Sequence, residues 1–303
     1  MRFTELLERP RLLLVAAILL QWLTTAVVAL RAETAAVGAI ELLNVLVLGP
    51  IGLVCAYRIG AAAGGAALGA WTLLVWVAAP WAMHAVTLAS YDATLRDRVL
   101  PLGLGLTPEP GYAAGVALLV AAALLTATGA ATTVAAGLAT AAGVLLTPEA
   151  VLFAAPAALA LLAARRPKEL GFFLAAIAPA LLVTLVWRQP TLDELSLDRL
   201  RGHFAGLREY FWSQRVLQWL PVAGAIAIGR RSVPLAFLLG GWFGAFLLAQ
   251  GTRAGVRLDD GELFRVLLPA LPAYVLLAAA LPLLVPTLAA RLGPLAQPAR
   301  SSS

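Results

Sequence analysis

The sequence predicts an all-α, polytopic integral membrane protein with about ten transmembrane helices. Hydrophobic residues make up 61% of the 303 residues, charged residues only 13%, and the mean hydropathy is +0.90. A soluble domain has roughly 45–50% apolar and about 25% charged residues. The apolar residues also gather into windows of roughly 17–25 residues, the length that a helix needs to cross the hydrocarbon core of a bilayer. Composition and window length therefore indicate the same fold class.

The expected transmembrane helices follow one another with short polar connections. The first window follows a basic N-terminus and is too long for the core of a signal peptide, so it is predicted to be a retained span. Several windows are short or rich in alanine, which leaves a span count one or two higher or lower open. Glycines at 64, 65 and 69 and at 240 and 241 are predicted to allow close helix packing. The windows are 12–30, 40–59, 61–82, 111–126, 132–146, 147–164, 170–187, 216–228, 233–249 and 266–284.

Residues 1–290 are predicted to form a single transmembrane domain, and residues 291–303 a disordered tail. The distribution of lysine and arginine predicts that both termini lie in the cytoplasm. With that orientation, short turns and tails on the inside carry basic residues, and the positive-inside rule applies to such short segments. These inside residues are Arg2, Arg9, Arg11, Arg58, Arg165, Arg166, Lys168, Arg230, Arg231, Arg291 and Arg300.

The same orientation places the longer polar segments, 89–109, 188–215 and 250–264, on the extracytoplasmic face of the cytoplasmic membrane. Within 188–215, leucine and phenylalanine alternate with charged residues at helical spacing, which predicts an amphipathic helix on the outer leaflet. A catalytic role and a role in resting on lipid or binding a partner are equally compatible with that helix. A working surface gathered outside favours an envelope enzyme or assembly factor over a transporter, whose charges would more commonly lie inside the spans.

Several other classes of protein are disfavoured by composition. Cys55 is the single cysteine, and the two histidines, His84 and His203, are far apart in the sequence, so no metal site is predicted. The net charge of +6 is scattered between apolar windows and forms no basic stripe with interleaved aromatic residues, so nucleic acid is not expected as a partner. The sequence contains no Gly-rich phosphate loop followed by lysine, no HExxH and no GxSxG.

The densest group of charges lies in 250–272, just before the last apolar window. Arg265 already lies among apolar residues there, so it should face the interior of the bundle or snorkel to the interface. A purely structural alternative is an ion pair with Glu262, three residues earlier on the same helical face. In 89–109, Asp92 and Arg96 have the i,i+4 spacing of a helical pair, which is either a surface salt bridge or part of a phosphate-binding site.

Three motifs resemble the multi-span glycosyltransferases of the GT-C superfamily, the dolichyl-phosphate-mannose mannosyltransferase-like enzymes. The motifs are Leu43-Asn44 through Tyr57-Arg58-Ile59-Gly60 with Ala79-Pro80-Trp81, then Gly143 to Ala150 with Arg165-Arg166, and finally Phe264 to Pro272. The resemblance implies a polyprenyl-phosphate sugar as the lipid-linked donor, transfer to an extracytoplasmic acceptor, and membrane lipid as the surroundings of the site.

The resemblance also implies roles for particular residues. Arg265, with Arg253, Arg257 or Arg96, would hold the carrier phosphate, and Asp92, Asp97 or Glu33 would deprotonate the acceptor hydroxyl. The polar segment 31–38 is shorter than the first outer loop of the family, which carries an acidic pair there, and the arginine of the family's Thr-Arg-Pro-Glu run is absent. A second hypothesis is therefore a non-catalytic relative that serves as a membrane scaffold or assembly subunit, with a partner membrane protein.

Overall fold

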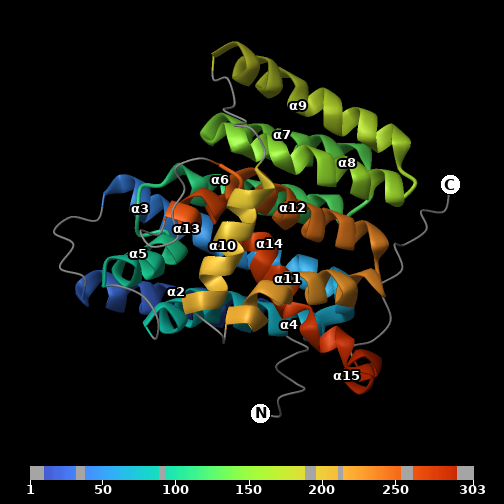
Figure 1. Ribbon diagram of the computed structural model, residues 1–303. Helices are drawn as coiled ribbons and strands as arrows, with labels where there is room; N and C mark the ends of the chain where they lie inside the picture. The colour runs from blue at the N-terminus through green and yellow to red at the C-terminus, as the bar shows by residue number, and fades with distance from the viewer. Residues whose placement is uncertain are drawn as a thin grey trace.

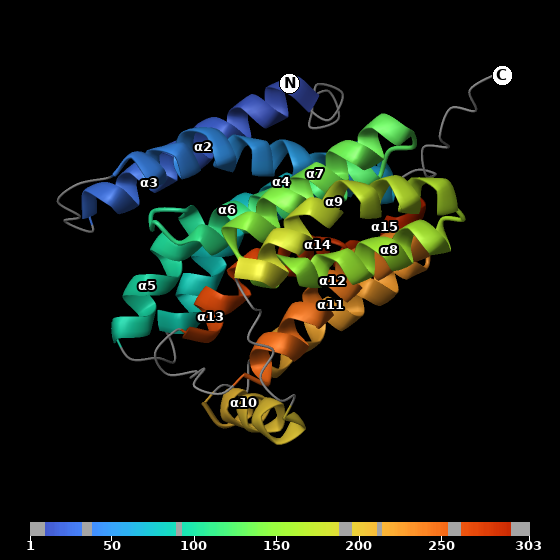
Figure 2. The same cartoon turned by 90° about the horizontal axis from the view of Figure 1, so that it is seen from above.

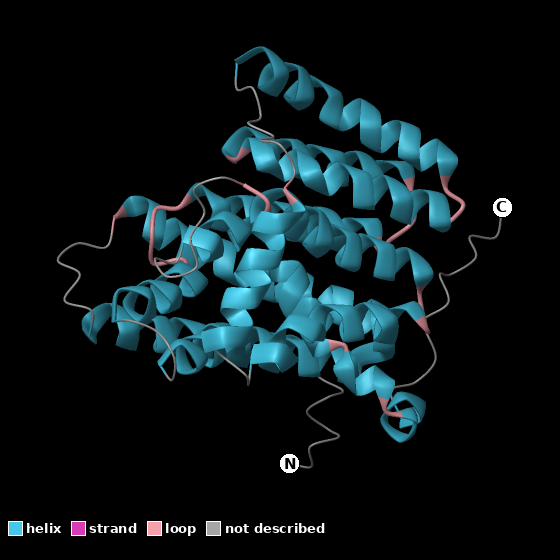
Figure 3. Ribbon diagram, in the orientation of Figure 1, coloured by secondary structure: helices cyan, strands magenta, loops and turns pink. Residues whose placement is uncertain are grey.

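The computed structural model describes residues 10–31, 38–88, 93–187, 196–210, 214–253 and 262–291. These residues form an all-α bundle without strands (Figures 1 and 3). The all-α part of the predicted fold class is confirmed. In chain order the elements are α2 (Pro10–Arg31), α3 (Ala39–Leu43), the π-helix η1 (Asn44–Leu48), α4 (Gly49–Leu88), α5 (Ala93–Leu104), α6 (Pro110–Leu125), α7 (Ala130–Leu146), η2 (Pro148–Phe153), α8 (Ala154–Ala163), α9 (Pro167–Trp187), α10 (Leu197–Tyr210), α11 (Gln214–Gly229), α12 (Val233–Gly251), α13 (Glu262–Leu267), η3 (Leu268–Ala270), α14 (Leu271–Ala279), η4 (Leu281–Leu284) and α15 (Pro286–Arg291).

Five helical segments of the described chain are long and apolar enough to cross a membrane. Their bounds are Pro10–Leu30, Ala39–Val86, Pro167–Thr184, Val233–Gly251 and Glu262–Leu284. Shorter apolar helices accompany them at Pro110–Leu125, Ala130–Leu146, Pro148–Ala163 and Trp219–Gly229. Such a set of apolar helices is typical of an integral membrane protein.

The segment Ala39–Val86 folds back on itself within α4. The backbone leaves helical geometry at Gly64 and Gly65, and Gly65 has a φ of +76°, which favours glycine. A Cβ added to Gly52 would lie 3.3 Å from the ring of Trp76, whereas a continuous helix would hold these residues roughly 36 Å apart. The two arms of α4 are therefore antiparallel neighbours.

The predicted packing role of the glycines in α4 is partly wrong. Gly64 and Gly65 form the turn, because the chain reverses there. Gly60 and Gly69 instead allow the arms to approach, since a Cβ at Gly60 would lie 3.2 Å from the Cα of Gly69. Gly69 thus packs as predicted, and so do Gly240 and Gly241, where an added Cβ would lie 3.2 Å from Ala225 and 2.8 Å from Pro156.

The core lies where α4, α6, α8, α12 and α14 meet. Its largest buried side chains include Trp242 and Phe153, whose rings meet edge to face with centroids 5.1 Å apart. Helix α11 packs closely against α14. Gly224 allows this approach, because a Cβ added there would clash with the backbone of Leu277. Figure 2 shows α2 and α3 along one edge of the bundle and α10 beyond the ends of α11 and α12. The packed core therefore holds the helices in place, and the ion pairs described below lie at the helix ends.

The expected helix within 188–215 forms α10. Arg199 Nη1 donates to the carbonyl of Thr252 at 3.1 Å, and His203 Nδ1 lies 2.8 Å from the carbonyl oxygen of Gly251. Because a carbonyl can only accept, His203 donates from Nδ1. Leu200 packs against Gly251, where an added Cβ would lie 2.7 Å from the leucine methyl. Helix α10 is thus held against the C-terminal end of α12.

Candidate functional site

Arg265 lies between two carboxylates at the start of the last apolar segment. Its Nε donates to Glu262 Oε2 at 2.9 Å and its Nη2 to Glu262 Oε1 at 2.5 Å. Its Nη1 lies 3.8 Å from Glu109 Oε1. We call these three residues the Arg265 cluster. The side chain of Arg265 is 50% exposed, so the guanidinium is accessible from outside the protein.

Local structure explains where the two carboxylates of the Arg265 cluster lie. Glu262 is in the first turn of α13 and Arg265 in its last turn, so one short helix presents both side chains on one face. Glu109 is the N-cap residue of α6 and precedes Pro110 at the first helical position. A carboxylate at a helix N-terminus is stabilised by the helix dipole. The cluster therefore joins the starts of two helices that are distant in sequence.

Hydrogen bonds from Asn44 hold the loop that carries Glu109 in place. Asn44, which is buried in the π-helix η1, donates from Nδ2 to the carbonyls of Gly105 at 3.2 Å and Thr107 at 3.3 Å. Gly105 has a φ of +73°, and a Cβ there would lie 2.8 Å from the ring of Tyr112. The position of Glu109 is thus set by contacts that only glycine and a buried amide provide.

A second ion pair lies at the same ends of the helices. Arg253 Nη1 lies 3.6 Å from Glu149 Oε1, and both side chains are about one third exposed. Glu149 is in the first turn of η2, after Pro148, and Arg253 follows the end of α12. We call these residues the Arg253 pair. The pair lies beside the contacts of α10 with Thr252 and Gly251.

The structure brings two of the predicted phosphate-binding arginines, Arg253 and Arg265, next to carboxylates. The ion pair of Arg265 with Glu262 that the i,i+3 spacing predicted is present in the structure. Glu33, Asp92 and Arg257 lie outside the described residues. Arg96 and Asp97 belong to α5, but the description does not extend to their side chains.

Sequence reasoning missed Glu109 and Glu149 as site residues. The only local signal was a glutamate next to a proline at a helix start, Glu109-Pro110 and Pro148-Glu149. That pattern is typical of a helix N-terminus, and it says nothing about a partner more than one hundred residues away in sequence.

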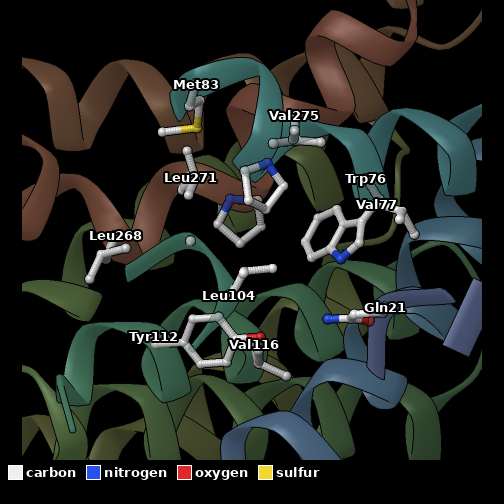
Figure 4. A pocket seen from close by; sticks show the side chains of 14 residues that line it. Gln21, Trp76, Val77, Met83, Leu104, Tyr112, Val116, Leu268, Leu271 and Val275 are labelled. Carbon is white, nitrogen blue, oxygen red and sulfur yellow. The ribbon is translucent and has the colours of Figure 1, made fainter. Parts of the chain in front are cut away.

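A small cavity lies one helical turn below the Arg265 cluster. It has a volume of about 50 Å³ and is bounded by the second arm of α4, by α2, by the end of α5, by the start of α6 and by η3 with α14 (Figure 4). Tyr112 and Leu268 line it, and each follows a cluster residue, Glu109 or Arg265, by one helical turn. An apolar cavity therefore adjoins a charged, exposed cluster.

The opposite ends of the helices carry a third ion pair with different surroundings. Arg166 pairs with Glu169, and it also donates to the carbonyls of Leu125 at 3.1 Å and Ala127 at 2.8 Å. Glu169 accepts hydrogen bonds from the hydroxyl of Thr133 at 2.8 Å and from the backbone N–H of Gly129 at 3.4 Å. We call Arg166, Glu169 and Thr133 the Arg166 cluster. It ties the α6–α7 turn to the α8–α9 turn.

Within the described ranges, no group of three or more His, Cys, Asp or Glu side chains could hold a metal ion. Comparison with protein-family models, with curated proteins and with solved structures finds no match to this chain. The fold and the apolar helices alone therefore define its class, that of an all-α protein built of helices able to cross a membrane.

Proposed function

We propose that the chain crosses the cytoplasmic membrane ten times and transfers a sugar from a polyprenyl-phosphate carrier to an extracytoplasmic acceptor. Counting the two arms of α4 separately and adding the four shorter apolar helices to the other long segments gives ten crossings. The three motifs that resemble the GT-C superfamily are the basis for the reaction class. The position of Arg265 is the structural observation that supports it best.

The distribution of charge between the two ends supports an orientation with both termini inside. The turns after α8 and α11 carry Arg165, Arg166, Arg230 and Arg231, and both are short. Short loops rich in arginine are retained in the cytoplasm. The Arg265 cluster and the Arg253 pair then lie on the extracytoplasmic side, together with α10.

The phosphate of the carrier would bind at Arg265 by exchange of partners. An exposed ion pair contributes only about 0–1 kcal/mol, so a phosphate can displace Glu262 at small cost. The planar guanidinium can then bind the phosphate through two hydrogen bonds, which an ammonium group does not match in geometry.

The same exchange would leave a carboxylate ready to act as a base. A carboxylate accepts the proton of the acceptor hydroxyl, the acceptor oxygen bonds to the anomeric carbon, and the bond from that carbon to the phosphate oxygen breaks. The electron pair of the broken bond stays on the carrier phosphate. Asp92, Asp97 and Glu33 are the bases that the resemblance implies, and Glu109 joins them because it lies next to Arg265.

A second function is supported by the charge of the Arg265 cluster. Two carboxylates already surround one guanidinium, and α10 presents an amphipathic surface at the same end. A scaffold or assembly subunit that binds a partner membrane protein through α10 would need no free cation. This alternative gives the opposite result in the experiment that follows.

The experiment measures binding of a short-chain polyprenyl phosphate to the purified protein in lipid nanodiscs. We expect Arg265→Lys to weaken binding and Arg265→Ala to abolish it nearly completely, while both variants fold. Arg201→Ala is the matched control, because Arg201 also pairs with an acid three residues earlier, Asp198, but on the exposed face of α10. Equal binding by wild type and Arg265→Ala would favour the scaffold.

A further inference from the structure

The cavity below the Arg265 cluster contains a buried amide that lacks part of its hydrogen bonding. Gln21 lies near the middle of α2, lines the cavity and is only 7% exposed. Its side-chain oxygen Oε1 is buried and has no hydrogen-bond partner among the residues that the structure describes. Leaving a buried acceptor unsatisfied costs stability. A group that donates to this oxygen from within the cavity would remove that cost.

The chain makes room for the amide at this place. A Cβ added to Gly49, at the start of α4, would lie 2.9 Å from Gln21 Nε2. Any other residue at 49 would therefore push the amide away from α4. The backbone next to Gly49 is the π-helix η1, and single π-turns frequently occur at functional sites. The start of α4 and the π-helix η1 therefore both constrain the position of the Gln21 side chain.

Two further hydrogen-bonding side chains face the same space. Figure 4 shows the indole nitrogen of Trp76 beside the Gln21 amide, and the ring of Tyr112 on the neighbouring wall. The other described residues that line the cavity are apolar or glycine, with no charged side chain among them. Pockets of this kind, apolar with a few convergent polar groups, are typical of sites for small or lipidic ligands.

The lining selects an uncharged ligand. An ion would lose its solvation in a cavity without a counter-charge, which is strongly unfavourable. The buried Gln21 oxygen lacks a donor, and the indole N–H of Trp76 can donate to an acceptor in the cavity. A hydroxyl group is both a hydrogen-bond donor and an acceptor. The volume of about 50 Å³ exceeds the roughly 10–15 Å³ that one water needs, but it holds only the end of a chain rather than a whole lipid.

We propose that this cavity binds the hydroxyl end of an uncharged long-chain alcohol, with Gln21 accepting from the hydroxyl and Trp76 donating to it. The apolar chain lies against the aliphatic walls, among them Leu104 and Val116. This site differs from the proposed phosphate site, because no charged side chain is among its described lining residues. It does not depend on glycosyl transfer.

The test compares ligands of equal chain length on the purified full-length protein in detergent micelles. The thermal unfolding midpoint is measured with dodecanol, dodecane and dodecanoate at equal mole fractions. We expect dodecanol to raise the midpoint more than either of the others. A fourth arm with diacylglycerol distinguishes a free alcohol from a lipid with a neutral hydroxyl head; stabilisation by either supports the proposal. Equal shifts with dodecanol and dodecane would overturn it, because the stabilisation would then not depend on the hydroxyl group.

Variants assign the effect to the cavity. Gln21→Leu replaces the amide by an apolar side chain of similar size, so the protein should fold and should lose the preference for dodecanol over dodecane. Thr25→Val is the matched control, because Thr25 is one turn further along α2, is also buried, and also has a hydroxyl without a partner among the described residues. It is not among the described lining residues and should keep the preference. A preference that survives Gln21→Leu would overturn the proposal.

A measurement that does not depend on stability completes the test. A twelve-carbon alcohol with a diazirine at the carbon next to the hydroxyl is bound and photolysed, and labelled peptides are mapped by mass spectrometry. We expect label on the second arm of α4, near Trp76, and its loss in Gln21→Leu. Labelling spread over the outer helices of wild type, without a peak at α4, would contradict the proposal.

Discussion

Each end of the bundle contains an arginine–glutamate ion pair with i,i+3 spacing, but the surroundings of the two pairs differ. Arg166 and Glu169 are three residues apart, and so are Glu262 and Arg265. The side chains of the first pair are 14% and 19% exposed, and two carbonyls, a hydroxyl and a backbone N–H also hydrogen-bond to them, while Arg166 Nε has no partner among the described residues. Arg265 is half-exposed, and a second carboxylate, that of Glu109, lies near it in addition to Glu262.

The difference shows which pair can change its partners. The Arg166 cluster uses its hydrogen bonds to hold two turns together, so removing one group leaves others buried and unsatisfied. The Arg265 cluster pairs at the surface, where the net contribution is small and a competing anion can replace a carboxylate. One cluster is therefore suited to stability and the other to binding.

The largest expected effect separates the two ends by their side of the membrane. In a Cys55→Ser background, Asp198→Cys on α10 should react fully in intact cells with a membrane-impermeant maleimide, because Asp198 is 93% exposed and the proposed orientation places α10 outside. Lys168→Cys, in the exposed first turn of α9 beside the Arg166 cluster, should react only after permeabilisation. Labelling of Lys168→Cys in intact cells would contradict the proposed orientation.

The next effect concerns stability at the Arg166 cluster. Arg166→Ala leaves Glu169 largely buried without its counter-charge, so we expect a loss on the order of 3 kcal/mol in the free energy of unfolding. Unfolding in mixed detergent micelles measures it. The control Arg201→Ala breaks an exposed i,i+3 pair and should cost about 0.5 kcal/mol or less. A similar cost for both variants would remove the distinction between the clusters.

A smaller effect is expected at the Arg265 cluster. Arg265→Ala removes an exposed cation that two carboxylates share, and we expect a change of about 1 kcal/mol or less in the free energy of unfolding. The change should shrink further as salt is raised, because exposed charges are screened. The same unfolding experiment at low and high salt tests this. A loss as large as that of Arg166→Ala would assign Arg265 a structural role.

The sequence predicted those parts of this comparison that are local. Apolar windows and the i,i+3 spacing of Glu262 and Arg265 are both short-range patterns, so the helices and the pair could be predicted from them. The contacts Glu109–Arg265 and Glu149–Arg253 join distant helices, and no periodicity indicates them.

The error at Gly64 and Gly65 has a related cause. Small residues allow both close packing and a reversal of the chain, and only the positive φ at Gly65 distinguishes the two. For the Arg166 cluster, the sequence indicated a basic turn but not the carbonyls of Leu125 and Ala127 that arginine binds. Those acceptors are backbone atoms, which every residue type provides.

Binding of a polyprenyl phosphate to the Glu262→Gln variant tests most directly whether the Arg265 cluster exchanges partners. The amide is close in size to the carboxylate but does not compete with the phosphate for the guanidinium. Because an exposed pair contributes up to about 1 kcal/mol, we expect the variant to bind the carrier up to about five times more tightly than wild type. Glu169→Gln, the same change in the Arg166 cluster, should leave carrier binding unchanged in the fraction of protein that folds. Weaker or equal binding by Glu262→Gln would contradict the exchange of partners at Arg265.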